Sequence, residues 1–162
     1  MIRLSNKKKT SLYRFFNIIL LMILSGGCIS FIIDRIRFNI LDEKSYFLIV
    51  IPVVLLIVMY LHGRQIFEYD SEGEAIHFRN RSIFPFFNKP QSDEFPKYKL
   101  VKFEMISILF FRRLYVTILS KNSGTTTLKY EISYLTRKEV NDLKTSLNKI
   151  IIANKEKDIK NK

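Results

Sequence analysis

The fold is decided by two apolar stretches, Tyr13–Ile33 (YRFFNIILLMILSGGCISFII) and Tyr46–Leu61 (YFLIVIPVVLLIVMYL). After Arg14 the first stretch carries no charge, and a helix of about 19 residues extends ~28 Å, close to the ~30 Å hydrocarbon core of a bilayer. The second stretch is slightly shorter and contains Pro52. Its Leu, Ile, Val and Phe residues favour insertion by about 4–7 kcal/mol, whereas a proline inside a helix costs ~3 kcal/mol. The two stretches therefore predict transmembrane helices at residues 13–33 and 46–62.

Two other interpretations of the first stretch were weighed. Two buried core helices would need a larger globular partner than a chain of 162 residues supplies. The segment LSGGC, which ends at Cys28, is similar to a lipoprotein signal, but apolar residues continue to Ile33, where a mature lipoprotein would be polar. We interpret Gly26, Gly27 and Ser30 as small residues that let the two helices pack closely.

The orientation of this hairpin follows from its basic flanks. Residues 1–14 contain no acidic residue, whereas the connecting loop 34–45 has fewer Lys and Arg residues and balances them with acids. The positive-inside rule therefore predicts a cytoplasmic tail at 1–12, an external loop at 34–45 and a cytoplasmic domain from residue 63, so that both termini are cytoplasmic. The basic residues of the first segment are Arg3, Lys7, Lys8, Lys9 and Arg14.

The net charge of +12 indicates the kind of partner. Most of the excess lies near the two chain ends, beside the predicted membrane, where each Lys or Arg gains ~1 kcal/mol from anionic lipid. The sequence contains no recognition-helix, zinc-finger or base-stacking signature. We therefore expect the membrane, with anionic lipid headgroups, as the partner and no nucleic acid. A single cysteine excludes an intrachain disulfide.

The remaining residues predict strands followed by one helix. Alternating apolar residues indicate a β-hairpin, 65–70 and 74–81, around a turn at Gly73, and a second hairpin, 110–120 and 125–135, which buries Leu128, Tyr130 and Ile132. Between them, residues 82–95 are expected to be irregular. A further strand spans 100–105. Its inward residues are expected to be Val101, Phe103 and Met105.

The domain is predicted to close with a helix. Thr136 and Glu139 form a T-x-x-E capping box, in which each side chain accepts a hydrogen bond from a backbone N–H at the helix start. Apolar residues at helical spacing from Val140 to Ile151 make one stripe. After Ala153 no core-forming pattern remains, so residues 154–162 are expected to be a basic tail.

Three segments, IFEYDSEGEAIHFRN, FPKYKLVKFEM and LTRKEVNDLKTSLNKII, together resemble the bacterial pleckstrin-homology-like (PH-like) domain family over residues 63–153. The resemblance implies an α+β fold in which a bent antiparallel sheet, nearly a barrel, is closed at one end by the C-terminal helix. Members of the family are commonly attached to the membrane. The expected location is therefore the bacterial inner membrane.

The resemblance also implies a headgroup site. PH domains that bind phosphoinositides carry basic residues on the first two strands, where this chain has Arg64, Arg79 and Arg81. The acidic turn DSEGE between the strands would repel phosphate, so the alternative is a solvated or salt-bridged strand face.

An aromatic loop, IFPFFNKP, is the other candidate interaction site. Phe84, Phe86 and Phe87 could dock on the bilayer or a partner, with Arg112 and Arg113 on lipid phosphates, or could complete the core of the domain.

The sequence offers no catalytic or metal-binding motif, so we expect neither an enzyme nor a cofactor. The first functional hypothesis is a non-enzymatic inner-membrane protein whose PH-like domain acts as an adaptor for a protein or lipid. The alternative is a structural subunit of a larger membrane assembly, held by its hairpin.

Overall fold

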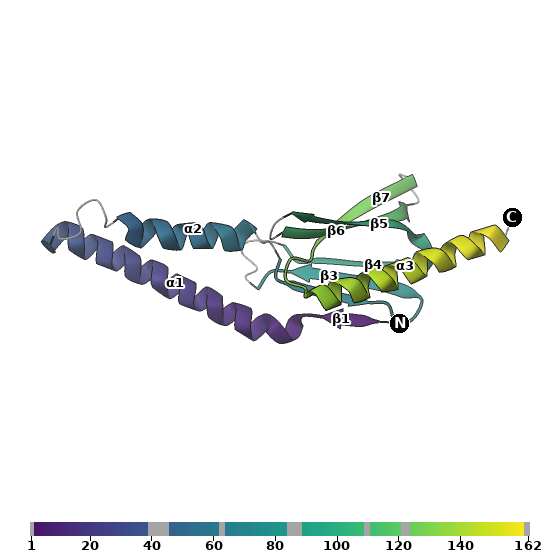
Figure 1. The fold of residues 1–162 in the computed structure, drawn as a ribbon, viewed down its shortest axis with the longest axis horizontal. Helices are drawn as coiled ribbons and strands as arrows, with labels where there is room; N and C mark the ends of the chain where they lie inside the picture. Colours follow the sequence, from purple (N-terminus) through teal and green to yellow (C-terminus); the bar gives the residue numbers. More distant parts are fainter. Residues whose placement is uncertain are drawn as a thin grey trace. The chain divides into compact units, whose positions relative to one another are not determined.

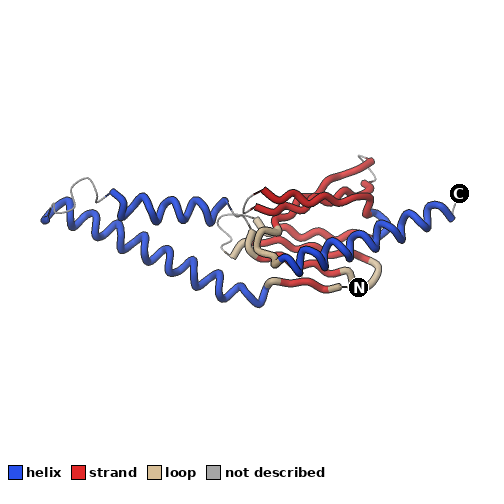
Figure 2. The backbone as a smooth tube through the Cα atoms, viewed as in Figure 1, coloured by secondary structure: helices blue, strands red, loops and turns tan. Residues whose placement is uncertain are grey.

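The computed structural model describes residues 2–38, 46–61, 64–83, 89–108, 111–120 and 124–160. The chain divides into two compact units. One is Ser11–His62, which we call the helical unit, and the other is Met1–Thr10 together with Gly63–Lys162, which we call the sheet domain. The described part contains three α-helices and two antiparallel sheets, so the chain is an α+β protein (Figures 1 and 2).

The helical unit consists of α1 (Thr10–Ile33), a π-helical turn (Asp34–Phe38) and α2 (Phe47–Leu61). The helices approach each other closely at Gly27. A Cβ atom there would overlap the carbonyl oxygen of Leu48 and lie 3.3 Å from its carbonyl carbon. The rings of Phe31 and Tyr46 pack nearby, with centroids 5.5 Å apart. Both predicted helical stretches are therefore helices, and a residue without a side chain is required at position 27.

The other two small residues that were predicted to pack against the second helix, Gly26 and Ser30, have more open surroundings. Gly26 has no atom within 4 Å of the position that a Cβ would take, and Ser30 is exposed. Ser25 donates a hydrogen bond to the carbonyl of Met22, one turn earlier in the same helix. Gly27, rather than Gly26, is thus the position at which α1 meets α2.

One helical run in the described part is long and apolar enough to cross a membrane. It spans Lys7–Ile36, and its most apolar window has a mean hydropathy of 2.4 with 17% of the window buried. Length and composition alone support this statement. The apolar part of α2, Phe47–Val58, is shorter.

The first sheet has the strand order β1-β2-β3-β4, in which β1 is Arg3–Ser5, β2 is Ile66–Asp70, β3 is Ala75–Arg81 and β4 is Gln91–Pro96. The predicted hairpin of β2 and β3 is confirmed, with Gly73 at a φ of +72° in its turn. Two expectations were wrong. Arg3–Ser5 is a strand rather than part of a tail, and Gln91–Pro96 is a strand rather than irregular.

The second sheet has the order β5-β6-β7, with β5 at Leu100–Ile108, β6 at Phe111–Ser120 and β7 at Gly124–Glu131. Phe103 and Met105 pack against the core as predicted, but Val101 is 40% exposed. The reason is a register irregularity between Leu100 and Lys102, which lets Leu100 take the buried position instead.

Aromatic rings from both sheets meet in the core. The ring of Phe78 on β3 stacks on Tyr130 of β7 at 4.6 Å and lies 5.1 Å from the ring of Tyr69 and 5.9 Å from that of Phe95. The Tyr130 hydroxyl donates to Asp93 Oδ2 at 2.8 Å. Burial, and then this hydrogen bond, raise the pKa of Tyr130, so the hydroxyl stays protonated.

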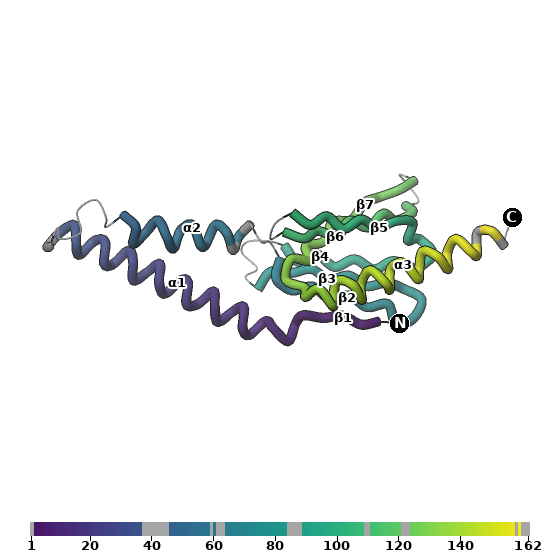
Figure 3. The backbone as a smooth tube through the Cα atoms, viewed as in Figure 1, coloured from purple at the N-terminus to yellow at the C-terminus, as the bar shows by residue number. Residues whose placement is uncertain are grey.

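Helix α3 (Arg137–Lys160) contacts both sheets. The predicted capping box is confirmed, because Glu139 N donates to Thr136 Oγ1 at 3.3 Å and Thr136 N donates to Glu139 Oε2 at 2.7 Å. Ser146 lies 2.8 Å from the hydroxyl of Tyr69 on the first sheet, and Asn154 Nδ2 donates to the carbonyl of Leu100 on the second. Figure 3 shows the helix continuing beyond the sheets.

The apolar stripe of α3 is confirmed, but the predicted end of the helix is wrong. Leu143 and Leu147 are fully buried, and Val140, Ile150 and Ile151 pack against the core. The helix continues through residues 154–160, which had been predicted to be a tail. Lys and Glu favour helix once a preceding turn is in place, and Asn154 anchors this segment to the 3₁₀ turn Lys97–Lys99.

Candidate functional site

Strand β1 belongs to the sheet domain although it precedes the helical unit in the chain. Its register with β2 pairs Arg3 with Asp70 and Ser5 with Glu68, and Leu4 packs against the core. Strand β1 precedes α1 in the chain, and β2 follows α2. The whole helical unit is therefore inserted between two neighbouring strands of one sheet.

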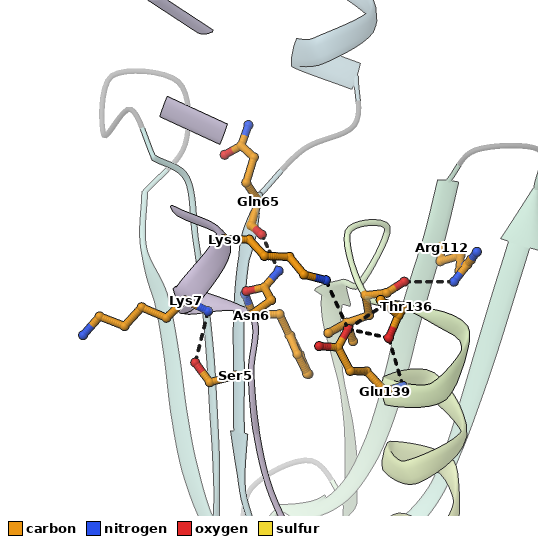
Figure 4. A network of polar contacts seen from close by, with 10 residues as sticks. Ser5, Asn6, Lys7, Lys9, Gln65, Arg112, Thr136 and Glu139 are labelled. Carbon is orange, nitrogen blue, oxygen red and sulfur yellow. Dashed lines mark hydrogen bonds and ion pairs between the residues drawn. The ribbon is translucent and has the colours of Figure 1, made fainter. Parts of the chain in front are cut away.

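Asn6 fastens this connection. Its side chain is buried, with 2% exposed, and pairs with two backbone groups on the other side of the insertion. Asn6 Nδ2 donates to the carbonyl of Gln65 at 2.7 Å, and Phe67 N donates to Asn6 Oδ1 at 2.9 Å. Asn6 N also donates to the carbonyl of Phe67 at 3.3 Å. The side chain thus extends the β1–β2 pairing by one position, as Figure 4 shows in part.

The segment after Asn6 meets the start of α3. A 3₁₀ turn (Lys7–Lys9) follows Asn6, and Lys9 Nζ lies 3.9 Å from Glu139 Oε2 (Figure 4). Basic residues therefore flank this ion pair in both segments, the turn before α1 and the first turn of α3, although the side chain of Lys7 extends away from Glu139 in Figure 4. We call them the junction surface. Its residues are Lys7, Lys8, Lys9, Arg137 and Lys138, of which all but Lys9 are exposed.

Two arginines that were predicted to contact lipid make hydrogen bonds to loops of the domain. Arg112 Nη1 donates to the carbonyl of Leu135, just before α3, at 3.1 Å. Arg64 Nε donates to the carbonyl of Lys89 at 3.2 Å, and its Nη1 donates to Gln91 Oε1 at 3.0 Å. These hydrogen bonds occupy several of the guanidinium donors.

The outer face of the first sheet carries alternating charges rather than a basic patch. Arg3 Nε lies 3.8 Å from Asp70 Oδ2, and His77 Nδ1 lies 3.4 Å from Glu94 Oε2 on the next strands. Three of these side chains, those of Arg3, Asp70 and His77, border a hollow of about 360 Å³, whose other lining residues include both charge signs. The lining residues are Arg3, Leu4, Ser5, Lys7, Glu68, Tyr69, Asp70, His77 and Arg79.

The predicted headgroup residues do not act as one group. Arg81 Nη2 lies 3.3 Å from Glu68 Oε1 and Arg64 bonds to loop carbonyl and amide oxygens, so both are engaged within the protein. Arg79 is exposed. Arg113 is half-buried and lies opposite Glu131 in the β6–β7 register. This arrangement supports the salt-bridged alternative for the strand face.

The remaining predicted residues are placed as follows. Arg14 is exposed on α1, in the turn after its first. The aromatic residues Phe84, Phe86 and Phe87 lie outside the described residues, so docking and core packing both stay predictions. Within the described ranges, no group of three or more His, Cys, Asp or Glu side chains gathers as a metal site would require.

Sequence analysis missed two features of this site. Asn6 stands in a short polar segment with no strand pattern, and only its pairing across the helical unit shows its role. Arg137 and Lys138 carry no signal of a site in the sequence. Only the tertiary contact of Lys9 with Glu139 brings their segment next to the segment of Lys7 and Lys8.

Comparisons with known proteins found no match to a protein-family model, to a curated protein or to a solved structure.

Proposed function

We propose that this chain is a two-span integral protein of the bacterial inner membrane whose sheet domain acts as a non-enzymatic adaptor at the cytoplasmic surface. The observation that carries the proposal is the pairing of β1 with β2 across the helical unit. If α1 crossed a bilayer and the chain did not cross back, β1 and β2 would lie on opposite sides and could not share a ladder. Membrane crossing by α1 therefore requires a second crossing before Ile66.

Residues 46–61 form the only apolar stretch between α1 and β2 that can make this second crossing. Helix α2 has 15 residues, which extend ~22 Å. A helix this short is accommodated by local thinning of the bilayer at a modest cost. Tyr46 and Tyr60, one just before α2 and one near its end, are 50% and 57% exposed, as aromatic residues at the two membrane interfaces would be.

The side of the membrane follows from the basic residues. Lys7, Lys8 and Arg14 are exposed at the start of α1, and the positive-inside rule places such a cluster in the cytoplasm. Because β1 pairs with β2, the whole sheet domain would then lie on the cytoplasmic side as well.

The adaptor role has support from the architecture of the sheet domain. Antiparallel strands and a final helix that contacts them are what the PH-like resemblance implies, although the strands form two sheets rather than one bent sheet. We propose that this domain binds a protein or lipid at the membrane surface. The alternative is a subunit held in a larger assembly through Gly26, Gly27 and Ser30. Leu48 of the same chain already occupies the position beside Gly27, whereas Gly26 has open space around it and Ser30 is exposed.

Cysteine labelling in intact cells tests the two-span proposal. In a Cys28→Ser background, which removes the one native cysteine, Glu43→Cys tests the loop between the helices and Lys157→Cys tests the last helix. A membrane-impermeant maleimide is expected to label Glu43→Cys in intact cells and Lys157→Cys only after permeabilisation. Labelling of Lys157→Cys in intact cells would refute the proposed topology.

A further inference from the structure

The junction surface is basic because its acidic neighbour is already engaged. Glu139 caps the first turn of α3 through Thr136 and also pairs with Lys9 at 3.9 Å. The exposed side chains that remain are Lys7, Lys8, Arg137 and Lys138. Four cations thus lie on two segments that this ion pair holds together.

The junction surface is also close in the chain to the start of α1. Lys9 directly precedes Thr10, the first residue of that helix. The three residues Lys7–Lys9 extend only ~5 Å, so all three lie close to the start of α1. If α1 enters the membrane, the cations of the 3₁₀ turn lie at the level of the headgroups. The ion pair between Lys9 and Glu139 brings the first turn of α3 to the same level.

We propose that the junction surface binds anionic lipid headgroups of the leaflet that the sheet domain faces. This inference rests on the membrane insertion proposed above and names the lipid class and the residues involved. Lys7 of this surface also borders the open hollow beside β1 and β2. Exposed lysines act as point charges that suit a diffuse anionic surface more than one oriented ligand. Two backbone N–H groups at the start of α3, those of Thr136 and Glu139, are already capped, and the proposal rests on the basic side chains.

Lipid retention by the full chain tests the proposal. The protein is purified in a mild nonionic detergent and equilibrated with equal amounts of phosphatidylglycerol and phosphatidylcholine that carry the same acyl chains. Mass spectrometry then counts the retained lipids of each class. The native protein is expected to retain phosphatidylglycerol in several-fold excess, because each basic residue contributes roughly fivefold.

A matched pair of variants locates the effect. The variant Lys7→Gln/Lys8→Gln/Arg137→Gln/Lys138→Gln removes four exposed charges from the junction surface. The control, Lys144→Gln/Lys149→Gln/Lys155→Gln/Lys157→Gln, removes the same charge from exposed positions further along α3. The junction variant is expected to lower the ratio of the two lipids to near one, and the control to keep the native ratio.

The outcomes are separable from those of the labelling experiment, which measures the sides of the membrane and not the lipid class. Raising the salt concentration from ~0.05 M to ~0.5 M is expected to weaken the preference of the native protein, because it shortens the Debye length. A ratio near one for the native protein, or an equal loss in both variants, would overturn the proposal.

Discussion

Replacing Phe78 with alanine is expected to lower the free energy of unfolding of the sheet domain by about 3–5 kcal/mol. The ring is fully buried and stacks on Tyr130 at 4.6 Å, so it joins β3 of the first sheet to β7 of the second. Its removal would leave a cavity between the two sheets and also eliminate the ring contacts with Tyr69 and Phe95. Because a domain of this size is stable by only ~5–15 kcal/mol, this loss is a large fraction of its stability.

The measurement is urea unfolding of the full chain in detergent, followed by near-ultraviolet circular dichroism. Tyr98→Ala is the control, because Tyr98 is in the same domain and 66% exposed. A loss no larger for Phe78→Ala than for Tyr98→Ala would show that the ring cluster does not hold the sheets together.

The substitution Asn6→Leu is expected to cost about 2–4 kcal/mol and to release β1 from the sheet. Leucine has a similar size but removes both side-chain hydrogen bonds, which leaves Phe67 N and the carbonyl of Gln65 buried without these partners. The observable is hydrogen exchange, which is expected to quicken at the backbone amides of β1 and of the β2 residues that pair with it.

Asn141→Leu on α3 is the matched control, because Asn141 is exposed. If the two variants show the same exchange rates in β1 and β2, Asn6 does not fasten the ends of the helical unit together.

Much of the fold was predictable because its determinants are local. The β2–β3 hairpin follows from alternation around Gly73, and the start of the last helix follows from the capping box of Thr136 and Glu139. The stripe that contains Leu143 and Leu147 identifies the buried face of that helix. Each of these features is determined by one continuous segment of the chain.

Other features depend on partners distant in the sequence. Strand β1 has three residues, and only pairing with β2 makes it a strand. The polar strand β4 buries Phe95 and is recognised by its register with β3. The exposure of Val101 follows from an irregular pairing with β6, which an alternating pattern does not reveal.

The candidate site divides in the same way. The basic cluster at Lys7–Lys9 is visible in the sequence, but its association with Arg137 and Lys138 requires the contact between Lys9 and Glu139. In the expected group of Arg64, Arg79 and Arg81, two residues contact other side chains of the domain. Arg64 donates a hydrogen bond to Gln91, and Arg81 pairs with Glu68. The sequence of one strand does not show whether an acidic side chain lies opposite a basic one on the neighbouring strand.

A cross-strand disulfide in the native membrane tests the central claim, that the segments before and after the helical unit pair on one side of the bilayer. Ser5 and Glu68 are register partners, and directly opposed antiparallel residues have Cα atoms about 4.5–5.5 Å apart, which suits a disulfide.

In a Cys28→Ser background, Ser5→Cys/Glu68→Cys is expected to form the disulfide on mild oxidation of isolated membranes. Its control, Ser5→Cys/Ser92→Cys, should not, because Ser92 lies on β4, two strands further away. Free thiols are counted with a maleimide that shifts the protein on a gel. Protected thiols in the first pair alone would agree with the account, and free thiols in both pairs would contradict it.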